Sequence, residues 1–383
     1  MTKTKILDRL LIAFAVLAVF YILSVSDIFA KFGQNVKDAP VTYKLEQVTS
    51  GLSHPWSLAF LPDGDMLVSE RDGRLSRIAK ETGKVQPVQN LPPVISYGQG
   101  GLLEVLPHPD FAENGLIYLS HSIPIGNEVT LAVTMAKLED AELTELREIF
   151  RLPKPSSSGV HFGSRMVFDN QGFLYITIGE RGDRPRAQDK SDPAGGIIRL
   201  NADGTIPESN PFTADKTAHP ALYAPGIRNA QGMALHPETG DIWFHEHGPR
   251  GGDEVNILKA GTNYGWPRIS YGKEYALPKN VGEAGEADWV KPPVHVWTPS
   301  IAPSGMAFYT GDAFPAWKNS LFAGALAGTH LARLVLDGNK ITAEEKLLAE
   351  TGRRIRDVRQ GPDGLLYLLF DDAESGIYRL APP

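Results

Sequence analysis

The sequence predicts an all-β fold: a six-bladed β-propeller with long loops on one face, preceded by an N-terminal apolar signal or anchor helix. Two observations predict it. A short sequence motif, which consists of a tight turn followed by an apolar β-rich run, occurs six times after residue 41. Glycine (38) and proline (29) are abundant, which indicates many turns and loops rather than long helices.

The six copies share a turn that is usually Asp-Gly, Asn-Gly or a close variant. They occupy residues 62–69, 113–120, 170–177, 238–245, 317–324 and 362–369. Such turns suit the positive-φ positions of a hairpin, and the apolar run fits a strand that is buried on both faces. No copy is long enough to bury its own apolar face, so radial stacking must close the core. The uneven spacing predicts insertions, which collect on one face.

Four copies follow another apolar segment, which we expect to pair with them as the preceding strand. These segments are residues 57–60, 165–168, 232–235 and 305–308. Residues 42–48 could supply one further strand, which would pair with the C-terminal blade and close the ring.

Composition and charge limit the function classes. The 383 residues carry a formal net charge of −7, and the body of the chain has no dense stripe of Lys and Arg. Nucleic-acid binding needs a basic surface that neutralises phosphates, so we expect no nucleic-acid partner. Because the chain has no cysteine, its fold relies on its core or on bound metals rather than on disulfides.

The N-terminus carries an export signal. Three basic residues precede an apolar run at residues 10–25: Lys3, Lys5 and Arg9. A basic flank before an apolar stretch is typical of export, with the positive end left in the cytoplasm. Bulky Ile28 and Phe29 stand where a cleavage site prefers small residues, so both a cleaved signal peptide and an uncleaved anchor stay open.

Both possibilities divide the chain in the same way. Residues 1–30 are the signal peptide or signal anchor, residues 31–40 are a linker, and residues 41–383 are the propeller domain. The body is then expected in the periplasm or elsewhere outside the cytoplasm, and membrane contact is limited to the N-terminal segment.

The first candidate site is a histidine and a glutamate at one end of a predicted hairpin. His161 stands just before one strand, and Glu180 ends the next. A hairpin returns both residues to the same edge, where a carboxylate would orient an imidazole and raise its basicity, as a general base requires. The alternative is a turn histidine beside a solvated glutamate.

Arg228 and Asn229 place a fixed cation and an amide just before another predicted strand. A guanidinium suits carboxylates or a developing oxyanion. The alternative is a structural arginine that ties two blades together.

Arg354 and Arg356 alternate in an extended segment, so their side chains lie on one side of it. Two guanidiniums in this arrangement suggest a small polyanionic ligand. The alternative is a solvated run of charges.

The densest polar segment is residues 245–254, followed by residues 263–267. Glycine and proline force unusual backbone here and expose carbonyl oxygens, and Asp253 and Glu254 add carboxylates. Such oxygens suit Ca²⁺ better than Zn²⁺, and the His-x-His pair in this segment lacks an evident third zinc ligand. The alternative is an irregular loop without metal.

The glycine-rich segment at residues 97–102 lacks the G-x-G-x-x-G spacing of dinucleotide-binding turns. No G-x-x-x-x-G-K-[ST] loop occurs anywhere in the chain. A nicotinamide-dependent or ATP-dependent enzyme is therefore poorly supported.

Taken in order, these segments resemble the soluble sugar dehydrogenases that use pyrroloquinoline quinone (PQQ), and specifically the aldose sugar dehydrogenase branch. The resemblance covers nearly all of the chain after about Val41. The matching stretches are residues 99–103, 161–165, 228–232, 248–254, 263–266 and 354–357. The resemblance implies PQQ- and Ca²⁺-dependent oxidation of aldose sugars at C1 to the lactone. Electrons would pass to an external acceptor, such as a quinone, a cytochrome or a dye.

The resemblance also implies catalytic roles. His161 matches the base that removes the proton of the C1 hydroxyl while hydride passes to PQQ. Glu180 stands where the family has an acidic residue that supports this histidine. Arg228 matches the cation that stabilises negative charge on the quinone oxygen.

Other matches concern the cofactor. Gln99 and Asn229 match polar contacts to PQQ, and Arg354 and Arg356 match the arginines that hold its carboxylates. Ala327 stands at about the place where glucose-type members have a lysine on the cofactor. This departure removes one cationic contact to PQQ.

The remaining matches concern calcium. The carbonyls of Gly248 and Pro249 match ligands of the Ca²⁺ that polarises PQQ. Glu254 and the carbonyl of Tyr264 match a second, structural calcium site.

Two other functions stay open. A calcium-dependent propeller lactonase or hydrolase would use metal-bound water and would not need Arg354 and Arg356. A non-catalytic binding propeller would tolerate the loss of His161 and Arg228, so their joint presence argues against it.

Overall fold

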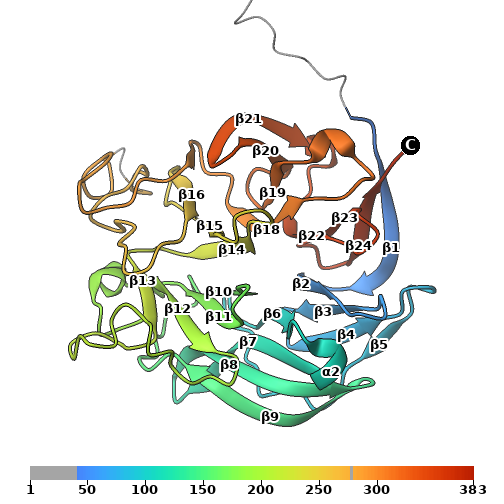
Figure 1. The fold of residues 1–383 in the computed structure, drawn as a ribbon, viewed down its shortest axis with the longest axis horizontal. Helices are drawn as coiled ribbons and strands as arrows, with labels where there is room; N and C mark the ends of the chain where they lie inside the picture. The colour runs from blue at the N-terminus through green and yellow to red at the C-terminus, as the bar shows by residue number, and fades with distance from the viewer. Residues whose placement is uncertain (1–40, 277–278) are drawn as a thin grey trace, which may run out of the picture. The chain divides into compact units, whose positions relative to one another are not determined.

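Six four-stranded antiparallel sheets surround a common axis in the computed structural model, which describes residues 41–276 and 279–383 (Figure 1). This confirms the predicted all-β, six-bladed propeller. The predicted signal segment, residues 1–30, and the whole of the predicted linker, residues 31–40, lie outside the described residues. In the part of the chain that the structure describes, no helix is long and apolar enough to cross a membrane.

The first strand of each blade lies nearest the axis and contacts the first strands of both neighbouring blades. The inner strands are β2 (Pro55–Phe60), β6 (Leu102–Pro107), β10 (Gly163–Phe168), β14 (Ala230–Leu235), β18 (Pro303–Tyr309) and β22 (Ile355–Gln360). Each second strand is formed by one copy of the repeated motif. The second strands are β3 (Met66–Glu70), β7 (Leu116–Ile125), β11 (Phe173–Ile178), β15 (Ile242–Glu246), β19 (Ser320–Ala325) and β23 (Leu366–Phe370).

Two further strands complete each blade toward its outer edge. The third strands are β4 (Arg74–Ile78), β8 (Glu128–Glu139), β12 (Gly196–Asn201), β16 (Asp253–Ile257), β20 (Leu331–Asp337) and β24 (Ser375–Ala381). The outer strands are β5 (Val85–Pro87), β9 (Glu142–Arg151), β13 (Leu222–Pro225), β17 (His295–Trp297), β21 (Lys340–Leu347) and β1 (Lys44–Leu52). The short helices are α2 (Phe111–Asn114), η1 (Arg184–Gln188), η2 (Pro315–Trp317) and η3 (Ala349–Thr351).

The ring closes through its first strand. β1 pairs antiparallel with β24, in a register that runs from Lys44 opposite Ala381 to Leu52 opposite Ser375. Figure 1 shows this N-terminal strand beside the C-terminal one. The predicted closing strand is confirmed, and it shares the last blade between the two ends of the described chain.

The turns between inner and second strands explain the repeated motif. Each holds one residue with positive φ, and these residues are Gly64, Gly115, Gly172, Gly240, Asn319 and Gly364. Glycine adopts this conformation without steric cost, and asparagine is the side chain that tolerates it best. The copy at residues 317–324 is weak in sequence because asparagine takes the place of glycine there.

Apolar side chains fill the space between blades. Tyr118 of β7 packs edge-on against Phe168 of β10, with ring centroids 5.2 Å apart. Trp243 of β15 packs in the same way against Phe308 of β18, at 5.6 Å. Each blade is therefore stabilised by its neighbours, as expected for units that cannot bury their own faces.

All six inner strands have a β-bulge at the end where they begin, opposite their second strands. The bulges lie between Pro55 and Ser57, Leu102 and Val105, Gly163 and Met166, Ala230 and Gly232, Pro303 and Met306, and Ile355 and Asp357. A bulge bends its strand and redirects the adjacent side chains. These repeated bulges therefore shape the face of the ring on which the inner strands begin.

Candidate active site

The predicted site residues lie on the connections that lead into inner strands. Gln99 precedes β6, His161 precedes β10, Arg228 precedes β14 and Arg354 precedes β22. These connections meet on one face, because their side chains share the walls of the same cavities.

Two adjoining cavities lie among these connections, with volumes of about 700 Å³ and about 230 Å³. The predicted residues that line the larger cavity are Gln99, His161, Arg228, Gly248 and Pro249. Those that line the smaller cavity are Gln99, Asn229, Arg354 and Arg356. Gln99, His247 and Ala302 line both. The larger volume is in the range of sites that hold small molecules.

His161 and Glu180 form a hydrogen-bonded pair, as the hairpin predicts. Nδ1 of His161 lies 2.5 Å from Oε2 of Glu180, which also accepts a hydrogen bond of 2.7 Å from the backbone N–H of Gly182. The Glu180 side chain is 1% exposed, whereas the His161 side chain is 12% exposed and lines the larger cavity. Among the described residues Nε2 has no partner, so this nitrogen is available to a ligand.

The backbone around His161 is unusual and held in place. Its φ is +57°, in a region that few non-glycine residues adopt. Its N–H donates to Oε1 of Gln99 at 2.8 Å. A side chain at Gly179 would bring its Cβ to 2.0 Å from the carbonyl oxygen of His161, so only glycine fits there. Non-glycine residues with positive φ are often found at functional sites, where the surrounding structure maintains them.

Burial lowers the pKa of His161 below its usual range. The hydrogen bond that Glu180 accepts from the ring opposes this effect, and the positive charges of Arg228 and Arg181 add to it. The neutral imidazole, the form that can accept a proton, is therefore favoured at neutral pH.

Arg228 brings a positive charge to the wall of the larger cavity. Its guanidinium donates to the carbonyls of His247 and Gly248 at 3.1 and 3.2 Å and to the hydroxyl of Tyr275 at 3.4 Å. Its backbone N–H donates to Oε2 of Glu246 at 2.6 Å. The guanidinium forms no salt bridge within residues 41–276 and 279–383, so its charge stays available to a ligand.

Asn229 links the two sides of the site. Its Oδ1 accepts hydrogen bonds from the N–H of Gly163, at 3.0 Å, and from Nε2 of Gln231, at 3.4 Å. The side chain is thereby fixed between the start of β10 and β14 while it lines the smaller cavity.

Arg354 and Arg356 share a single carboxylate. Their guanidiniums lie 3.4 and 3.2 Å from Oδ2 of Asp371. Burial would raise the pKa of Asp371, but Arg356, a hydrogen bond from His54 and Arg354 outweigh it and hold this pKa well below its usual range. Arg71 also lines this cavity. The smaller cavity therefore has more positive than negative charge.

The loop that would offer carbonyls to a metal is organised by Asp253. Its carboxylate accepts the N–H of Gly248 at 2.8 Å and the N–H groups of Ile301 and Ala302 at 2.8 and 3.0 Å. Asp253 thus shapes the loop instead of lying free as a ligand. Gly248 and Pro249 line the larger cavity.

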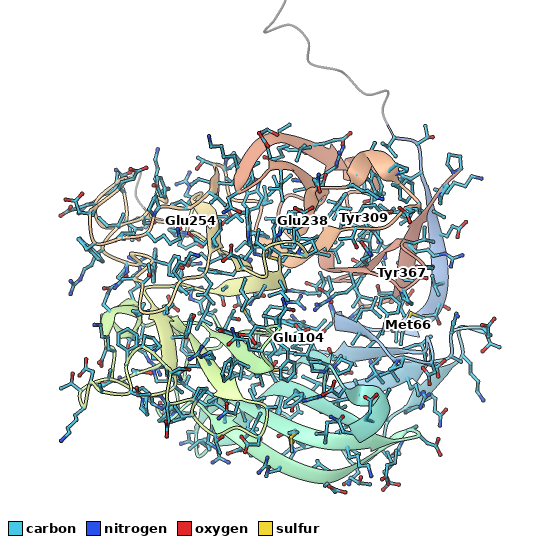
Figure 2. All side chains as sticks on the ribbon, in the orientation of Figure 1. Met66, Glu104, Glu238, Glu254, Tyr309 and Tyr367 are labelled. Carbon is cyan, nitrogen blue, oxygen red and sulfur yellow. The ribbon has the colours of Figure 1, made fainter. Side chains whose placement is uncertain are left out.

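Glu254 lies apart from both cavities, opposite Glu246 in the β15–β16 pair. Burial, and then the charge of Glu254, raise the pKa of Glu246 well above its usual range; burial raises that of Glu254 to about 7. Asn256 donates to Glu254 at 3.2 Å, while its own Oδ1 is buried without a partner among the described residues. Figure 2 shows Glu254 on the blade that contains β16.

These groups fit a calcium ion. Two buried carboxylates and an unpaired amide oxygen form a set of hard oxygen donors. Tyr264 packs against Phe244, the neighbour of Glu246 on the same face of β15, with ring centroids 4.9 Å apart. No three His, Asp or Glu side chains of the described residues are placed to hold one ion, so amide and backbone oxygens would complete the set.

The sequence patterns missed several residues of the cavity walls. Around the smaller cavity they are Trp56, Arg71 and Asp371, and around the larger one they are Arg250, Lys273 and Tyr275. The position in the repeat could have revealed two of them as cavity residues. Arg71 and Asp371 directly follow second strands, as His247 does. Glu180 follows its second strand by two residues. Ala327 lines the larger cavity, so the wall of this cavity has an alanine where the resemblance to glucose-type members would place a lysine.

Residues 52–379 match the family model "Glucose / Sorbosone dehydrogenase". Aldose sugar dehydrogenase YliI of Escherichia coli is 42% identical over 352 residues, which cover 90% of this chain and 94% of that protein. A solved glucose dehydrogenase is 46% identical, with a TM-score of 0.86 over 88% of this chain and 99% of that one. The PQQ-bound aldose sugar dehydrogenase of Streptomyces coelicolor is 28% identical, with a TM-score of 0.73 over 89% and 99%. The chain therefore belongs to the glucose/sorbosone dehydrogenase family and is a dehydrogenase.

Proposed function

We propose that the protein oxidises aldose sugars at C1 to the lactone in a reaction that depends on PQQ and Ca²⁺. The observation that carries this proposal is the arrangement around the two cavities. A histidine paired with a buried carboxylate, an arginine that forms no salt bridge with the described residues, and two arginines that share one aspartate line the two adjoining cavities. PQQ is a polyanionic quinone, and this excess of positive charge suits it.

His161 is the base in this proposal. Its Nε2 takes the proton of the C1 hydroxyl, while Glu180 at Nδ1 fixes the orientation of the ring and stabilises the imidazolium that forms. Gln99 holds the backbone of His161 in its unusual conformation. The low pKa of His161 keeps the ring neutral before the reaction.

When bound, PQQ would supply the hydride acceptor and Ca²⁺ would polarise it. Arg228 presents its positive charge where negative charge develops during the transfer. The guanidiniums of Arg354 and Arg356 would hold carboxylates of the cofactor. Gln99 and Asn229 would add polar contacts.

The carbonyls of Gly248 and Pro249 would hold the Ca²⁺ of the active site, and Glu254 with the carbonyl of Tyr264 would hold a structural Ca²⁺. Electrons then pass to an external acceptor such as a quinone, a cytochrome or a dye. The export signal predicted in residues 1–30 supports a location in the periplasm or elsewhere outside the cytoplasm.

Dye-linked oxidation of a panel of aldoses tests the proposal. The purified protein is assayed without additions, with PQQ, and with PQQ plus Ca²⁺. We expect activity only with both additions, and a roughly 10²- to 10⁴-fold lower kcat in His161→Ala. His219→Ala, which removes a histidine outside both cavities, is the matched control. Absence of PQQ-dependent oxidation together with absence of PQQ binding in a fluorescence titration would overturn the proposal and favour a lactonase or a binding propeller.

A further inference from the structure

The charged residues that line the larger cavity are all cations: Arg228, Arg250 and Lys273. No carboxylate of residues 41–276 and 279–383 lines it, although the whole chain carries a net charge of −7. Neither Arg250 nor Lys273 forms a salt bridge with any residue that the structure describes. The positive charge at this cavity is therefore local, and the described part of the protein leaves it without a counter-ion.

The backbone places two of these cations side by side. Arg250 and Lys273 are partners in an isolated antiparallel β-bridge. Residues directly opposite each other in such a pair present their side chains on the same side. Close contact fixes the pairing, since a Cβ at Gly272 would lie 2.5 Å from the carbonyl oxygen of Gly251. Both side chains are exposed, so they lie where the cavity meets solvent.

Several acidic residues near this cavity do not line it. Glu274, next to Lys273 in the chain, is held by both terminal nitrogens of Arg184 at 2.7 and 2.8 Å. Glu180 lies behind His161 and is bound to it. Glu254 and Glu286 lie close enough to Tyr271 that, after burial, they raise its pKa, but neither lines the cavity.

An aromatic ring lies beside these charges. Tyr275 lines the same cavity and is 62% exposed, and its hydroxyl is 3.4 Å from Nη2 of Arg228. An exposed ring at a cavity mouth can cover the apolar C–H face of a sugar while its hydroxyl remains hydrated. Aromatic surface next to uncompensated cations suits a sugar that carries a negative charge.

The cations of the two cavities form separate sets. Arg71, Arg354 and Arg356 line only the smaller cavity, whereas Arg250 and Lys273 line only the larger one. In the first set, Arg354 and Arg356 share the carboxylate of Asp371. In the proposed function this set holds a polyanionic cofactor. The second set is exposed to solvent and lines the same cavity as His161, so it can contact a substrate that reaches His161.

We propose that this dehydrogenase prefers aldoses that carry an anionic group away from C1, such as uronic acids or aldose phosphates, and that Arg250 and Lys273 bind this group. The inference rests on the proposed function, because it names the substrate class of the same site. The C1 hydroxyl of the anionic sugar reaches His161, and its carboxylate or phosphate lies between the two side chains.

Three sugars that share the C1 hydroxyl test the preference. Values of kcat/KM are measured for glucose, glucuronate and glucose 6-phosphate with the PQQ- and Ca²⁺-loaded protein. Arg250→Gln combined with Lys273→Gln should lower kcat/KM for each anionic sugar about fivefold or more relative to glucose. Lys216→Gln, which removes an exposed charge outside both cavities, is the control and should leave the ratios unchanged. Raised salt should reduce the anion preference of the parent protein.

A binding measurement separates this proposal from the activity. Methyl glucuronide and methyl glucoside are blocked at C1, so calorimetry compares their binding without turnover. Stronger binding of the glucuronide, lost in the double variant, supports the inference even if no sugar is oxidised. Oxidation of glucose with equal binding of both glycosides overturns the inference and leaves the proposed function intact. A weaker PQQ affinity of the double variant, with unchanged glycoside binding, would assign the two cations to the cofactor instead.

Discussion

The axis of the ring and its cavity face use the same kinds of charged side chain in different ways. Along the axis, Arg165 and Arg359 are matched by Glu104 and Asp357, two charges against two. Arg165 lies 2.7 Å from Glu104 and 3.1 Å from Asp357, and Arg359 lies 2.6 and 3.0 Å from the same two acids. Figure 2 shows Glu104 near the centre of the ring.

This axial network joins the inner strands. Glu104 belongs to β6, Arg165 to β10 and both Asp357 and Arg359 to β22. Ser57 and Leu58 of β2 hydrogen-bond to the two acids, and the carbonyl of Gln231 in β14 accepts from Arg165. Gly305 of β18 completes the ring, since a Cβ there would lie 1.9 Å from Oδ1 of Asp357.

The cavity face has the opposite arrangement. Arg228 has hydrogen bonds to carbonyls and a hydroxyl but no salt bridge among the described residues, and Arg354 and Arg356 share one aspartate. Across β15 and β16, Glu246 and Glu254 face each other with no salt bridge in that same part of the chain. Matched buried charges serve the structure, whereas unmatched ones indicate where an ion or a charged ligand binds.

The largest effect should come from breaking the matched set. Arg165→Met leaves Glu104 and Asp357 without a main partner in the interior, so we expect a loss of about 3 to 5 kcal/mol in the free energy of unfolding. Arg151→Met removes an arginine that pairs with Glu148 at the exposed edge of β9, and it should cost at most about 1 kcal/mol. Chemical denaturation measures both, and equal losses would contradict a structural role for the axis.

Local patterns explain why much of this molecule could be predicted from its sequence. The turns with positive φ and the apolar runs after them are short-range features, and they identified all six second strands. The pairing of His161 with Glu180 follows from hairpin geometry alone, because the two ends of β10 and β11 meet.

The axial network could not be predicted in this way. Glu104 and Arg359 are separated by 255 positions and come from different blades. Their pairing depends on how the blades pack around the axis, which no local pattern encodes. The same holds for Arg250 and Lys273, since their neighbourhood is created by one isolated bridge between irregular segments. Asp371 was missed although the same hairpin geometry applies to it, since it directly follows β23 and its partners Arg354 and Arg356 lie at the start of the paired strand β22.

Arg228→Met tests the unmatched cation. In the proposed reaction this charge faces the developing negative charge, so its loss should lower kcat about 10²- to 10³-fold. Stability should change less than in Arg165→Met, by about 1 to 2 kcal/mol, because only hydrogen bonds to neutral acceptors are lost. Steady-state kinetics and denaturation are measured on the same preparation. A stability loss as large as that of Arg165→Met, with kcat nearly intact, would remove the distinction between the two regions.

The unmatched acids should respond to calcium. For Ca²⁺ at 100 times its dissociation constant, a site in the native state alone adds about 2.7 kcal/mol to the free energy of unfolding. We therefore expect Ca²⁺ to raise the Tm of metal-free protein. Glu254→Gln should remove most of this increase, and Glu113→Gln, at an exposed position, should retain it. Equal increases in the two variants would place the ion elsewhere.

The smallest effect concerns the proposed base, His161, and its partner Glu180. Glu180 opposes the lowering of the His161 pKa by burial, so Glu180→Gln should lower this pKa further. The acid limb of kcat/KM then moves to lower pH, while kcat falls roughly 10- to 100-fold because the imidazolium loses its carboxylate. Asp183→Asn, an exposed acid in the same turn, should leave the limb in place. A limb that moves to higher pH in Glu180→Gln would show that the titrating group is not His161, and the base would have to be sought among the other residues of the larger cavity.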